Sequence, residues 1–178
     1  TNAGIDAARG EYIIFLNNDC EVLSPYWISL LQQLWDMTPN AGVVGPSIED
    51  AYNGQFCAFY CAMTSRAVID RIGKLDEAFE SGGEDIDFCR RAQRAGFQIR
   101  GGESVYDEHG ERKYGIHFPV IHQGETTVME DPQFEVKRER SHALLRERYP
   151  RFSLIIPTYN HLDLLKRCLT SVIAHTDL

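Results

Sequence analysis

The sequence predicts an α/β protein whose sheet is largely parallel, and its composition and length predict a globular chain of one domain, or of one domain and part of another. Short apolar runs such as "YIIFL" (12–16) and "GVVG" (42–45) alternate along the chain with segments of helical periodicity. The hydrophobic fraction of 43% is typical of globular proteins. The 178 residues are enough for one domain with its own core, or for one domain and part of another.

The boundaries of the predicted helices follow from capping residues. Ser24 and Pro25 suit the N-cap and the first position of one helix, and Gly96 suits the end of another. Asp131 and Pro132 open a third helix, which is rich in charges of both signs. In chain order, we predict strands at 12–16, 42–45, 56–64, 97–100 and 116–122, helices at 25–37, 84–96 and 131–149, a surface loop at 101–116, and a last strand, loop and helix within 152–178.

Composition and charge disfavour several classes of partner. The chain carries 26 acidic and 18 basic side chains, and this net charge of -8 argues against nucleic acid or an anionic membrane surface as the main partner. No apolar run approaches the roughly 20 residues of a membrane span. The five cysteines form no CxxC pair, so they predict free thiols, most simply buried small hydrophobes, in a reducing, cytoplasmic compartment.

Polar residues follow the first predicted strand directly. Asn17, Asn18 and Asp19 come straight after Leu16. In a parallel α/β sheet, ligands bind beyond the carboxyl ends of the strands, and a carboxylate there can hold a hard divalent cation. The same three residues are also ordinary turn formers, so their spacing alone leaves a metal site and a plain turn both open.

A second acidic group lies at the start of a predicted helix. Glu84, Asp85 and Asp87 follow two glycines, at a helix end where the dipole stabilises acids. Asp85 could face a cleft there as a general base, with the glycines allowing close approach of a substrate, or the three acids could have only a capping role. Asp87 precedes Arg90 and Arg91 at helical spacing, so a structural ion pair is the alternative for this side chain.

Histidine supplies the remaining candidates for metal binding. His122 follows an apolar strand and comes shortly before a glycine, and His109 and His117 compete with it on local evidence. His142 lies in a charged helix, so we expect it to be solvated. An isolated histidine is more often a hydrogen-bonded structural group than a ligand, and the local sequence therefore leaves the role of His122 open.

Four segments, taken together, resemble the family 2 glycosyltransferases, which have the GT-A nucleotide-sugar fold. "NAGIDAARGEYIIFLNND" (2–19) resembles the family's N-x-G segment followed by A-x-G-E-Y and the D-x-D strand. "IGKLDEAFESGGEDIDFCRRAQRAGF" (72–97) resembles its G-x-x-D-E-x-F, E-D and R-x-x-x-x-G run. "VIHQGET" (120–126) resembles the late H-x-x-G-S/T motif, and "SLIIPTYNHLDLLKRCLTSV" (153–172) resembles the family's first strand and helix.

The last segment is out of order, because the family's first strand normally precedes the D-x-D strand. We therefore expect residues 1–150 to be the C-terminal part of one transferase domain, with the metal, base and acceptor side. Residues 152–178 would be the first strand and helix of a following domain, and a circular permutation is the alternative. The family's second strand is missing, so we expect this chain by itself to be inactive. We also expect the strand at 153–157 to pack beside 12–16.

The resemblance implies roles for the residues singled out above. Asp19 and His122 would bind the Mn²⁺ or Mg²⁺ ion that bridges the donor diphosphate, with Asn17 in place of the first Asp of D-x-D. Asp85 would be the catalytic base, and Glu84 would help to position the acceptor. The donor-binding set that the resemblance implies is Asn2, Gly4, Asn17, Asn18, Pro157, Tyr159 and Asn160.

The function that the resemblance implies is metal-dependent, inverting transfer of a sugar from a nucleotide-diphospho-sugar to an acceptor hydroxyl. It would serve polysaccharide or glycan biosynthesis, with a glycan, a lipid-linked molecule or a protein as the acceptor. The longer protein could associate peripherally with the inner face of a membrane. A metal-dependent hydrolase on a similar sheet and a non-catalytic carbohydrate-binding remnant are the two alternatives.

Overall fold

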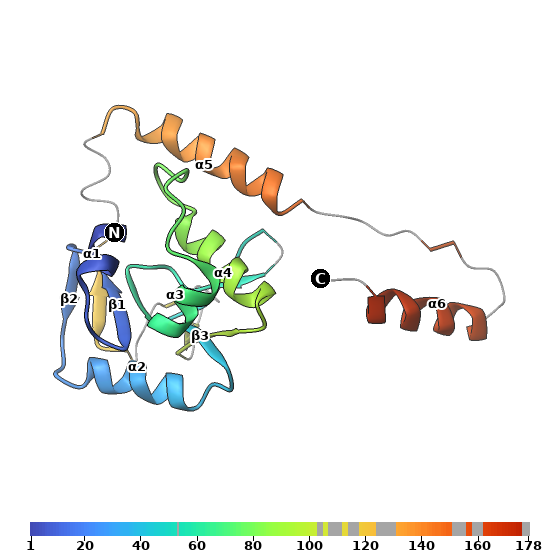
Figure 1. Cartoon of the computed structure of the whole chain (residues 1–178), viewed down its shortest axis with the longest axis horizontal. Coiled ribbons are helices and arrows are strands. Elements are labelled where there is room, and N and C mark those ends of the chain that lie inside the picture. The colour runs from blue at the N-terminus through green and yellow to red at the C-terminus, as the bar shows by residue number, and fades with distance from the viewer. Residues whose placement is uncertain are drawn as a thin grey trace.

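A four-stranded sheet with helices on both faces forms the centre of the fold (Figure 1). The computed structural model describes residues 1–52, 54–102, 105–106, 112–113, 118–123, 131–150, 156–157 and 162–175. The strand order of the sheet is β1-β6-β3-β7. These strands are β1 (Tyr12–Leu16), β3 (Ala41–Gly45), β6 (Cys61–Ser65) and β7 (Gln98–Gly101).

The α/β class is confirmed, but the sheet is mixed rather than largely parallel. β6 runs antiparallel to β1 on one side and to β3 on the other, whereas β3 and β7 are parallel. The reason lies in the connection from β3 to β6, residues 46–60. Its described residues form a small antiparallel pair, β4 (Glu49–Asp50) with β5 (Gln55–Phe56), and no helix, whereas a parallel crossover usually needs one. The strand predicted at 56–64 is accordingly split between β5 and β6.

Alternate side chains of the sheet pack into two separate cores, one on each face. Ile13 and Phe15 of β1 belong to the larger core, and Tyr12 and Ile14 pack against the other, as the two-residue period of a strand requires. The larger core is covered by α1 (Asn2–Ala7), α3 (Arg66–Ile72), α4 (Glu84–Arg94) and α5 (Phe134–Arg148), and the smaller one by α2 (Trp27–Asp36).

The predicted helices are present with small shifts of their starts. α2 begins at Trp27, because Ser24 belongs to a preceding turn in which its hydroxyl accepts a hydrogen bond from the amide of Tyr26 at 3.3 Å. In the same way Asp131 accepts from the amide of Gln133 at 2.9 Å, before α5 begins. The predicted glycine stop of α4 is confirmed, since Gly96 follows the helix with a φ of +88° that favours glycine.

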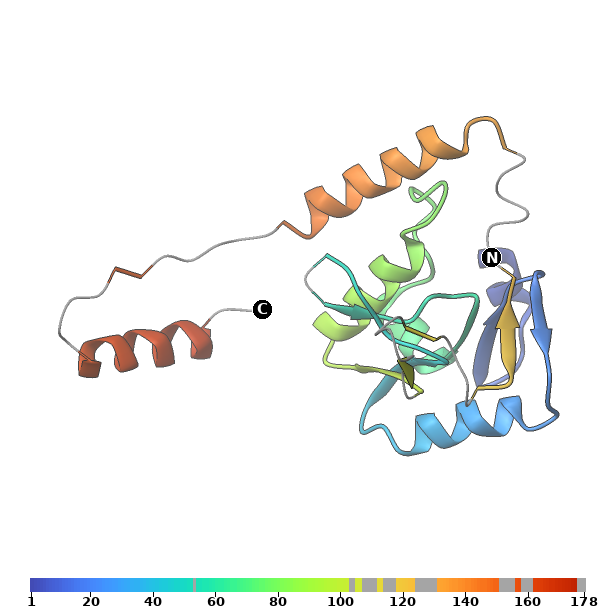
Figure 2. The ribbon, with the colours of Figure 1, turned by 180° about the vertical axis from the view of Figure 1, so that it is seen from behind.

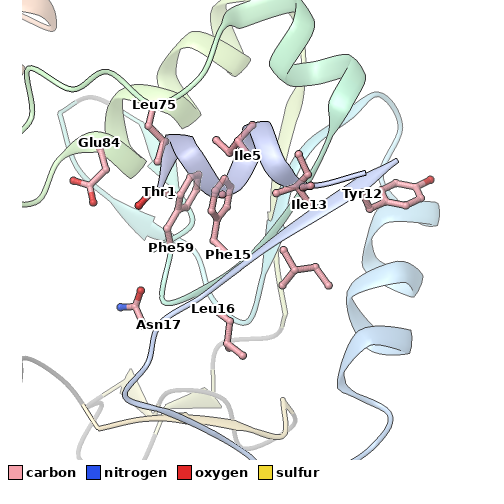
Figure 3. Close-up of a pocket in the computed structure, with 13 residues that line it drawn as sticks. Thr1, Ile5, Tyr12, Ile13, Phe15, Leu16, Asn17, Phe59, Leu75 and Glu84 are labelled. Carbon is pink, nitrogen blue, oxygen red and sulfur yellow. The ribbon is translucent and has the colours of Figure 1, made fainter. Parts of the chain in front are cut away.

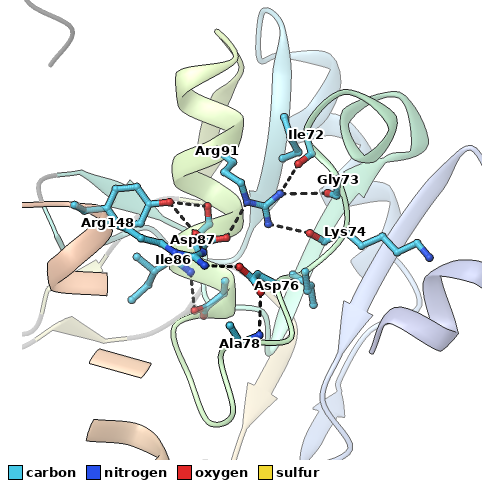
Figure 4. Close-up of polar contacts among 12 residues, drawn as sticks. Ile72, Gly73, Lys74, Asp76, Ala78, Ile86, Asp87, Arg91 and Arg148 are labelled. Atoms are coloured by element: carbon cyan, nitrogen blue, oxygen red, sulfur yellow. Dashed lines mark hydrogen bonds and ion pairs between the residues drawn. The ribbon is translucent and has the colours of Figure 1, made fainter. Parts of the chain in front are cut away.

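A buried carboxylate joins α4 to α5 (Figure 4). Asp87 is 1% exposed and accepts from Arg91 Nε at 2.8 Å, from Arg148 Nη1 at 2.9 Å and from the hydroxyl of Tyr149 at 2.9 Å. Arg148 also pairs with Asp76 at 2.6 Å, in the loop before α4. Of the structural alternatives left open for Asp87, pairing with Arg90 or with Arg91, the structure shows the pair with Arg91. The network fixes the start of α4, where the candidate base lies.

The last described helix, α6 (Leu162–His175), lies apart from the rest of the fold in Figures 1 and 2. The strand predicted at 153–157 falls largely outside the described residues, so its packing beside β1 stays a prediction. Among the described strands, β1 is at the edge of its sheet. Within the predicted loop 101–116, the described pieces β8 (Val105–Tyr106) and β9 (Arg112–Lys113) form an antiparallel pair.

Candidate functional site

The polar residues after β1 form a turn, and this turn carries Asp19 into a cluster of side chains. The amide of Cys20 donates to the carbonyl of Asn17 at 3.2 Å, and the amide of Asn17 donates to the carbonyl of Tyr60 at 2.9 Å. The turn interpretation is therefore right as local structure. It does not exclude the metal interpretation, because the Asp19 side chain ends 13% exposed beside His122.

His122 reaches Asp19 through a two-stranded ribbon. β2 (Cys20–Val22) and β10 (Val120–His122) are antiparallel, with His122 opposite Cys20. The amide of Gln123 donates to the Asp19 carbonyl at 3.0 Å, which fixes the end of the ribbon. As a result, His122 Nε2 lies 3.1 Å from Asp19 Oδ1 although 103 positions separate them in the printed sequence.

Tyr60 supports the imidazole from one face. Its ring is stacked on that of His122, with centroids 4.8 Å apart and planes 3° from parallel. Burial raises the pKa of Tyr60 to about 12, so the phenol stays neutral and acts as a flat support. Tyr60 was not among the residues predicted for the site, and no local signal marks it.

Cys20 is the third member of the cluster. Its Sγ, an oxygen of Asp19 and a ring nitrogen of His122 all lie within 4.8 Å of one another. The thiol donates to the carbonyl of Tyr60 at 3.2 Å, and its pKa is raised by burial and by the charge of Asp19. The expectation of a buried small hydrophobe is met by Cys57, Cys61 and Cys89, but it is wrong for Cys20, which is partly exposed, and for Cys168, which is exposed.

These residues fit a divalent cation. Asp19 Oδ1 is buried and, apart from its contact with His122, accepts no hydrogen bond of acceptable geometry from the described residues. Leaving a buried carboxylate oxygen without such a partner is costly. An ion bound by Asp19 and His122 would satisfy that oxygen, and carboxylate with imidazole is a donor set that suits Mn²⁺ or Zn²⁺.

Asp85 lies in the first turn of α4 and is held by backbone amides. Its Oδ1 accepts from the amide of Ile86 at 2.8 Å, and its Oδ2 accepts from the amide of Phe59 at 3.4 Å. Burial, reinforced by the charge of Glu84, raises the pKa of Asp85 to about 7. A carboxyl group with that pKa can accept a proton near neutral pH, as a general base must.

Of the two glycines before α4, Gly83 has a packing role, and the close approach of a substrate considered for the pair stays a prediction. Gly83 has a φ of +95°, and a Cβ there would lie 2.9 Å from Leu145 Cδ1 in α5. The missing side chain therefore makes room for packing between helices. Gly82, with a φ of +72°, has open space around its Cα.

A pocket of about 460 Å³ runs along β1, which is the edge strand among the described residues (Figure 3). Gly4, Asn17 and Glu84 contribute to its wall, with Phe59 at its side and Thr1 near Glu84. Glu84 Oε2 is buried without a hydrogen-bond partner among the described residues, so this carboxylate is available to a ligand. Asp19, Asp85 and His122 are not among the residues that line this pocket.

Phe59 and Tyr60, two consecutive residues, connect Asp85 of α4 to the cluster of Asp19, Cys20 and His122. The amide of Phe59 contacts Asp85, while the ring of Tyr60 stacks on His122 and its carbonyl accepts from Cys20. Asp85 and the cluster therefore contact adjacent residues of a single dipeptide, whose Cα atoms are about 3.8 Å apart.

The other predicted site residues are placed less directly. The side chain of Asn2 is engaged, since Nδ2 donates to the carbonyl of Leu75 at 2.9 Å and Oδ1 accepts from the Leu75 amide at 3.2 Å. It is not among the residues that line the pocket beside β1, and a contact with the donor stays a prediction. Asn18 and Pro157 are exposed. Tyr159 and Asn160 lie outside the described residues.

The structure does not place any of the other candidate histidines, among its described residues, in the cluster with Asp19. His109 and His117 lie outside the described residues. The expectation that His142 is solvated is wrong, because it is half-buried and hydrogen-bonded to the hydroxyl of Tyr52. None of the helices in the described ranges is long and apolar enough to cross a membrane.

Comparison with known proteins points to one family. Residues 1–83 match the family model for glycosyl transferase family 2. No curated protein and no solved structure gives a significant match to the chain. The matched segment includes β1, the Asp19 turn and the Phe59–Tyr60 dipeptide, and it ends directly before Glu84. Residues 1–83 are therefore similar to glycosyl transferase family 2, and this likeness covers 83 of the 178 residues.

Proposed function

We propose that the chain carries the metal, base and acceptor side of an inverting glycosyltransferase that uses a nucleotide-diphospho-sugar. The observation that supports this proposal is that Asp85 contacts Phe59, while His122, paired with Asp19, stacks on the adjacent Tyr60. The match of residues 1–83 to glycosyl transferase family 2 gives that arrangement its chemical context.

Asp85 is the proposed general base. Above about pH 7 its carboxylate is ionised and takes the proton of an acceptor hydroxyl. The hydroxyl oxygen then forms a bond to the anomeric carbon of the sugar, the bond from that carbon to the diphosphate breaks, and the nucleoside diphosphate leaves. One displacement of this kind inverts the anomeric configuration.

Asp19 and His122 are the proposed protein ligands of Mn²⁺ or Mg²⁺. Such an ion, when bound, offsets the negative charge that develops on the departing diphosphate. Tyr60 holds the imidazole plane, and the β2–β10 ribbon holds His122 beside Asp19. These residues therefore fix the two ligands before any substrate arrives.

Glu84 and the pocket beside β1 are the proposed substrate-binding surface. Glu84 has a buried, unpartnered oxygen among the described residues, and it can accept a hydrogen bond from a sugar hydroxyl. Gly4 and Asn17 line the same pocket, which is consistent with the donor side that the family resemblance implies for them. Pro157, Tyr159 and Asn160 would serve a following domain, within the proposed division at residues 150 to 152.

The proposal is tested by a transfer assay with a panel of nucleotide sugars, Mn²⁺ and glycan acceptors. It is run on this chain and on a longer polypeptide that also supplies the strands expected before Thr1. We expect transfer in the longer polypeptide, lost in Asp85→Asn with donor binding retained, and loss of metal-dependent donor binding in Asp19→Asn. Near-normal transfer by Asp85→Asn would remove this residue from the base role.

The same assay separates the two alternatives. Release of free sugar at the same rate with and without acceptor would indicate a metal-dependent hydrolase. Binding of donor or glycan with neither transfer nor hydrolysis would indicate a carbohydrate-binding remnant. Either result would overturn the transferase proposal for this site.

A further inference from the structure

We propose that Cys20 is a third protein ligand of the ion held by Asp19 and His122, and that it shifts the preference of this site toward Zn²⁺ or Co²⁺. The inference rests on the metal site of the proposed function. It changes the expected cofactor, because Mn²⁺ and Mg²⁺ bind weakly to sulfur.

The pairing of β2 with β10 places the thiol on the same side as the imidazole. Cys20 and His122 are direct partners in the antiparallel register, and such partners project to the same face of a ribbon. Asp19 adjoins Cys20 and closes the ribbon through its carbonyl. Three ligand types therefore converge from two short segments that are far apart in sequence.

The distances leave room for one ion. In a four-coordinate zinc site with bonds of about 2.0 to 2.3 Å, ligand atoms are about 3.3 to 3.8 Å apart. Asp19 Oδ1 and His122 Nε2 are 3.1 Å apart, and all three candidate ligand atoms lie within 4.8 Å of one another. A movement of about 1 Å closes the set around a metal.

The neighbouring groups also favour a bound cation. Asp19 Oδ1 is buried and lacks a well-directed hydrogen bond from the described residues. The thiol of Cys20 donates to the carbonyl of Tyr60, which remains well placed because it also accepts from the amide of Asn17. Binding releases the thiol proton to solvent. Three protein ligands with a fourth position open is the pattern of catalytic zinc sites, and that position can take a diphosphate oxygen.

The test is Co²⁺ titration of the full chain, followed by optical absorption. A thiolate ligand gives a sulfur-to-cobalt charge-transfer band in the near ultraviolet, which carboxylate and imidazole ligands do not give. Cys20→Ser is the test variant, and Cys168→Ser is the matched control, because Cys168 is exposed and lies in α6. Asp19→Asn reports whether the site binds any ion, and Mn²⁺ binding by calorimetry checks that Cys20→Ser is folded.

We expect the charge-transfer band in the wild-type protein and in Cys168→Ser, and its loss in Cys20→Ser. Loss of residues that only orient a ligand already lowers metal affinity about 10- to 100-fold, so we expect Cys20→Ser to weaken Zn²⁺ binding at least that much. Mn²⁺ affinity should change less than about threefold, because Mn²⁺ prefers oxygen and nitrogen ligands.

Three results would overturn the inference. They are Co²⁺ binding without the band, a band that survives in Cys20→Ser, and a wild-type protein that binds neither Co²⁺ nor Zn²⁺. Failure of the transferase proposal gives a different pattern, in which the band depends on Cys20 while the longer polypeptide transfers no sugar. If only the thiolate ligand is wrong, Asp19→Asn still weakens Mn²⁺ binding, but Co²⁺ binding to the wild-type protein gives no charge-transfer band.

Discussion

Asp85→Asn is expected to stabilise the fold at neutral pH and to have little effect in acid. Asparagine has the shape of a protonated aspartic acid and cannot ionise. It keeps the 2.8 Å hydrogen bond from the amide of Ile86, since its carbonyl oxygen can accept as Oδ1 does. The variant therefore removes the cost of a buried charge while leaving the start of α4 in place.

The magnitude follows from the pKa of Asp85. The folded value of about 7 lies above the usual 3.8, so wild-type stability is complete below about pH 4 and is lost as the pH rises to about 7. The difference is about three units, each worth about 1.4 kcal/mol. Because solvent reaches this half-buried side chain, we expect Asp85→Asn to be more stable by about 2 to 4 kcal/mol at about pH 8.

The assay is urea denaturation at several pH values between about 2 and 8, comparing each variant with the wild-type protein. Asp76→Asn is the control of opposite sign. Hydrogen bonds from the amide of Ala78 and from Arg148 lower the pKa of Asp76, so its contribution is present at neutral pH and is lost as the pH falls through that lowered value. A stability difference for Asp85→Asn that is constant across the range would refute the reasoning.

Three other substitutions test the packing and support of the site. Arg148→Met removes two ion pairs, one of them to the fully buried carboxylate of Asp87, and should lower the free energy of unfolding by about 3 kcal/mol in urea. Gly101→Ala would place a Cβ 2.7 Å from the backbone before β4 and should cost about 1 to 3 kcal/mol in the same assay. Tyr60→Ala removes the ring stacked on His122 and should lower Mn²⁺ affinity about tenfold in calorimetry, whereas Tyr60→Phe should not.

Matched controls are available for each of these changes. Arg140 is 70% exposed and 3.6 Å from Glu80, so Arg140→Met should cost less than about 0.5 kcal/mol. Gly4 lies in α1, and a Cβ there would meet no atom within 4 Å, so Gly4→Ala should stabilise by about 0.5 kcal/mol. Equal effects of the two arginine variants, a harmless Gly101→Ala, or unchanged metal affinity in Tyr60→Ala would contradict the respective predictions.

Local sequence was sufficient for most of the elements. The run Tyr12–Leu16 is strand from end to end, because five apolar residues with β-branched members fit a sheet that is covered on both faces. Helix α4 was predicted within two residues, since acids at its start and Gly96 after its end are local signals. These features depend on residues that are close together in the chain, so they can be predicted from the sequence.

The direction of β6 was not predictable in the same way. The apolar run that contains Cys61–Ser65 indicates a buried strand, but it carries no information about which way the strand runs. That depends on the connection 46–60, which has no strong helical pattern and forms the short β4–β5 pair instead. An α/β pattern alone therefore led to the wrong expectation of a largely parallel sheet.

The cluster around Asp19 was predicted only in part. Asp19 and His122 were identified by resemblance to a family, not by spacing, because the contact between them depends on the β2–β10 pairing. Cys20 belongs to no CxxC pair, so the usual spacing of metal-binding cysteines did not indicate it. The position of Cys20 directly after Asp19 was the available signal. That position indicates a metal ligand only once His122 is known to lie opposite Cys20 in the β2–β10 pair.

The central claim is that Asp19 and His122 hold one divalent ion beside Asp85. Anomalous scattering from Mn²⁺-soaked crystals of the full chain tests it most directly. We predict one ordered Mn²⁺ in contact with both the carboxylate of Asp19 and the imidazole of His122. An ordered ion at any other group, with the Asp19–His122 pair left free of metal, would contradict it.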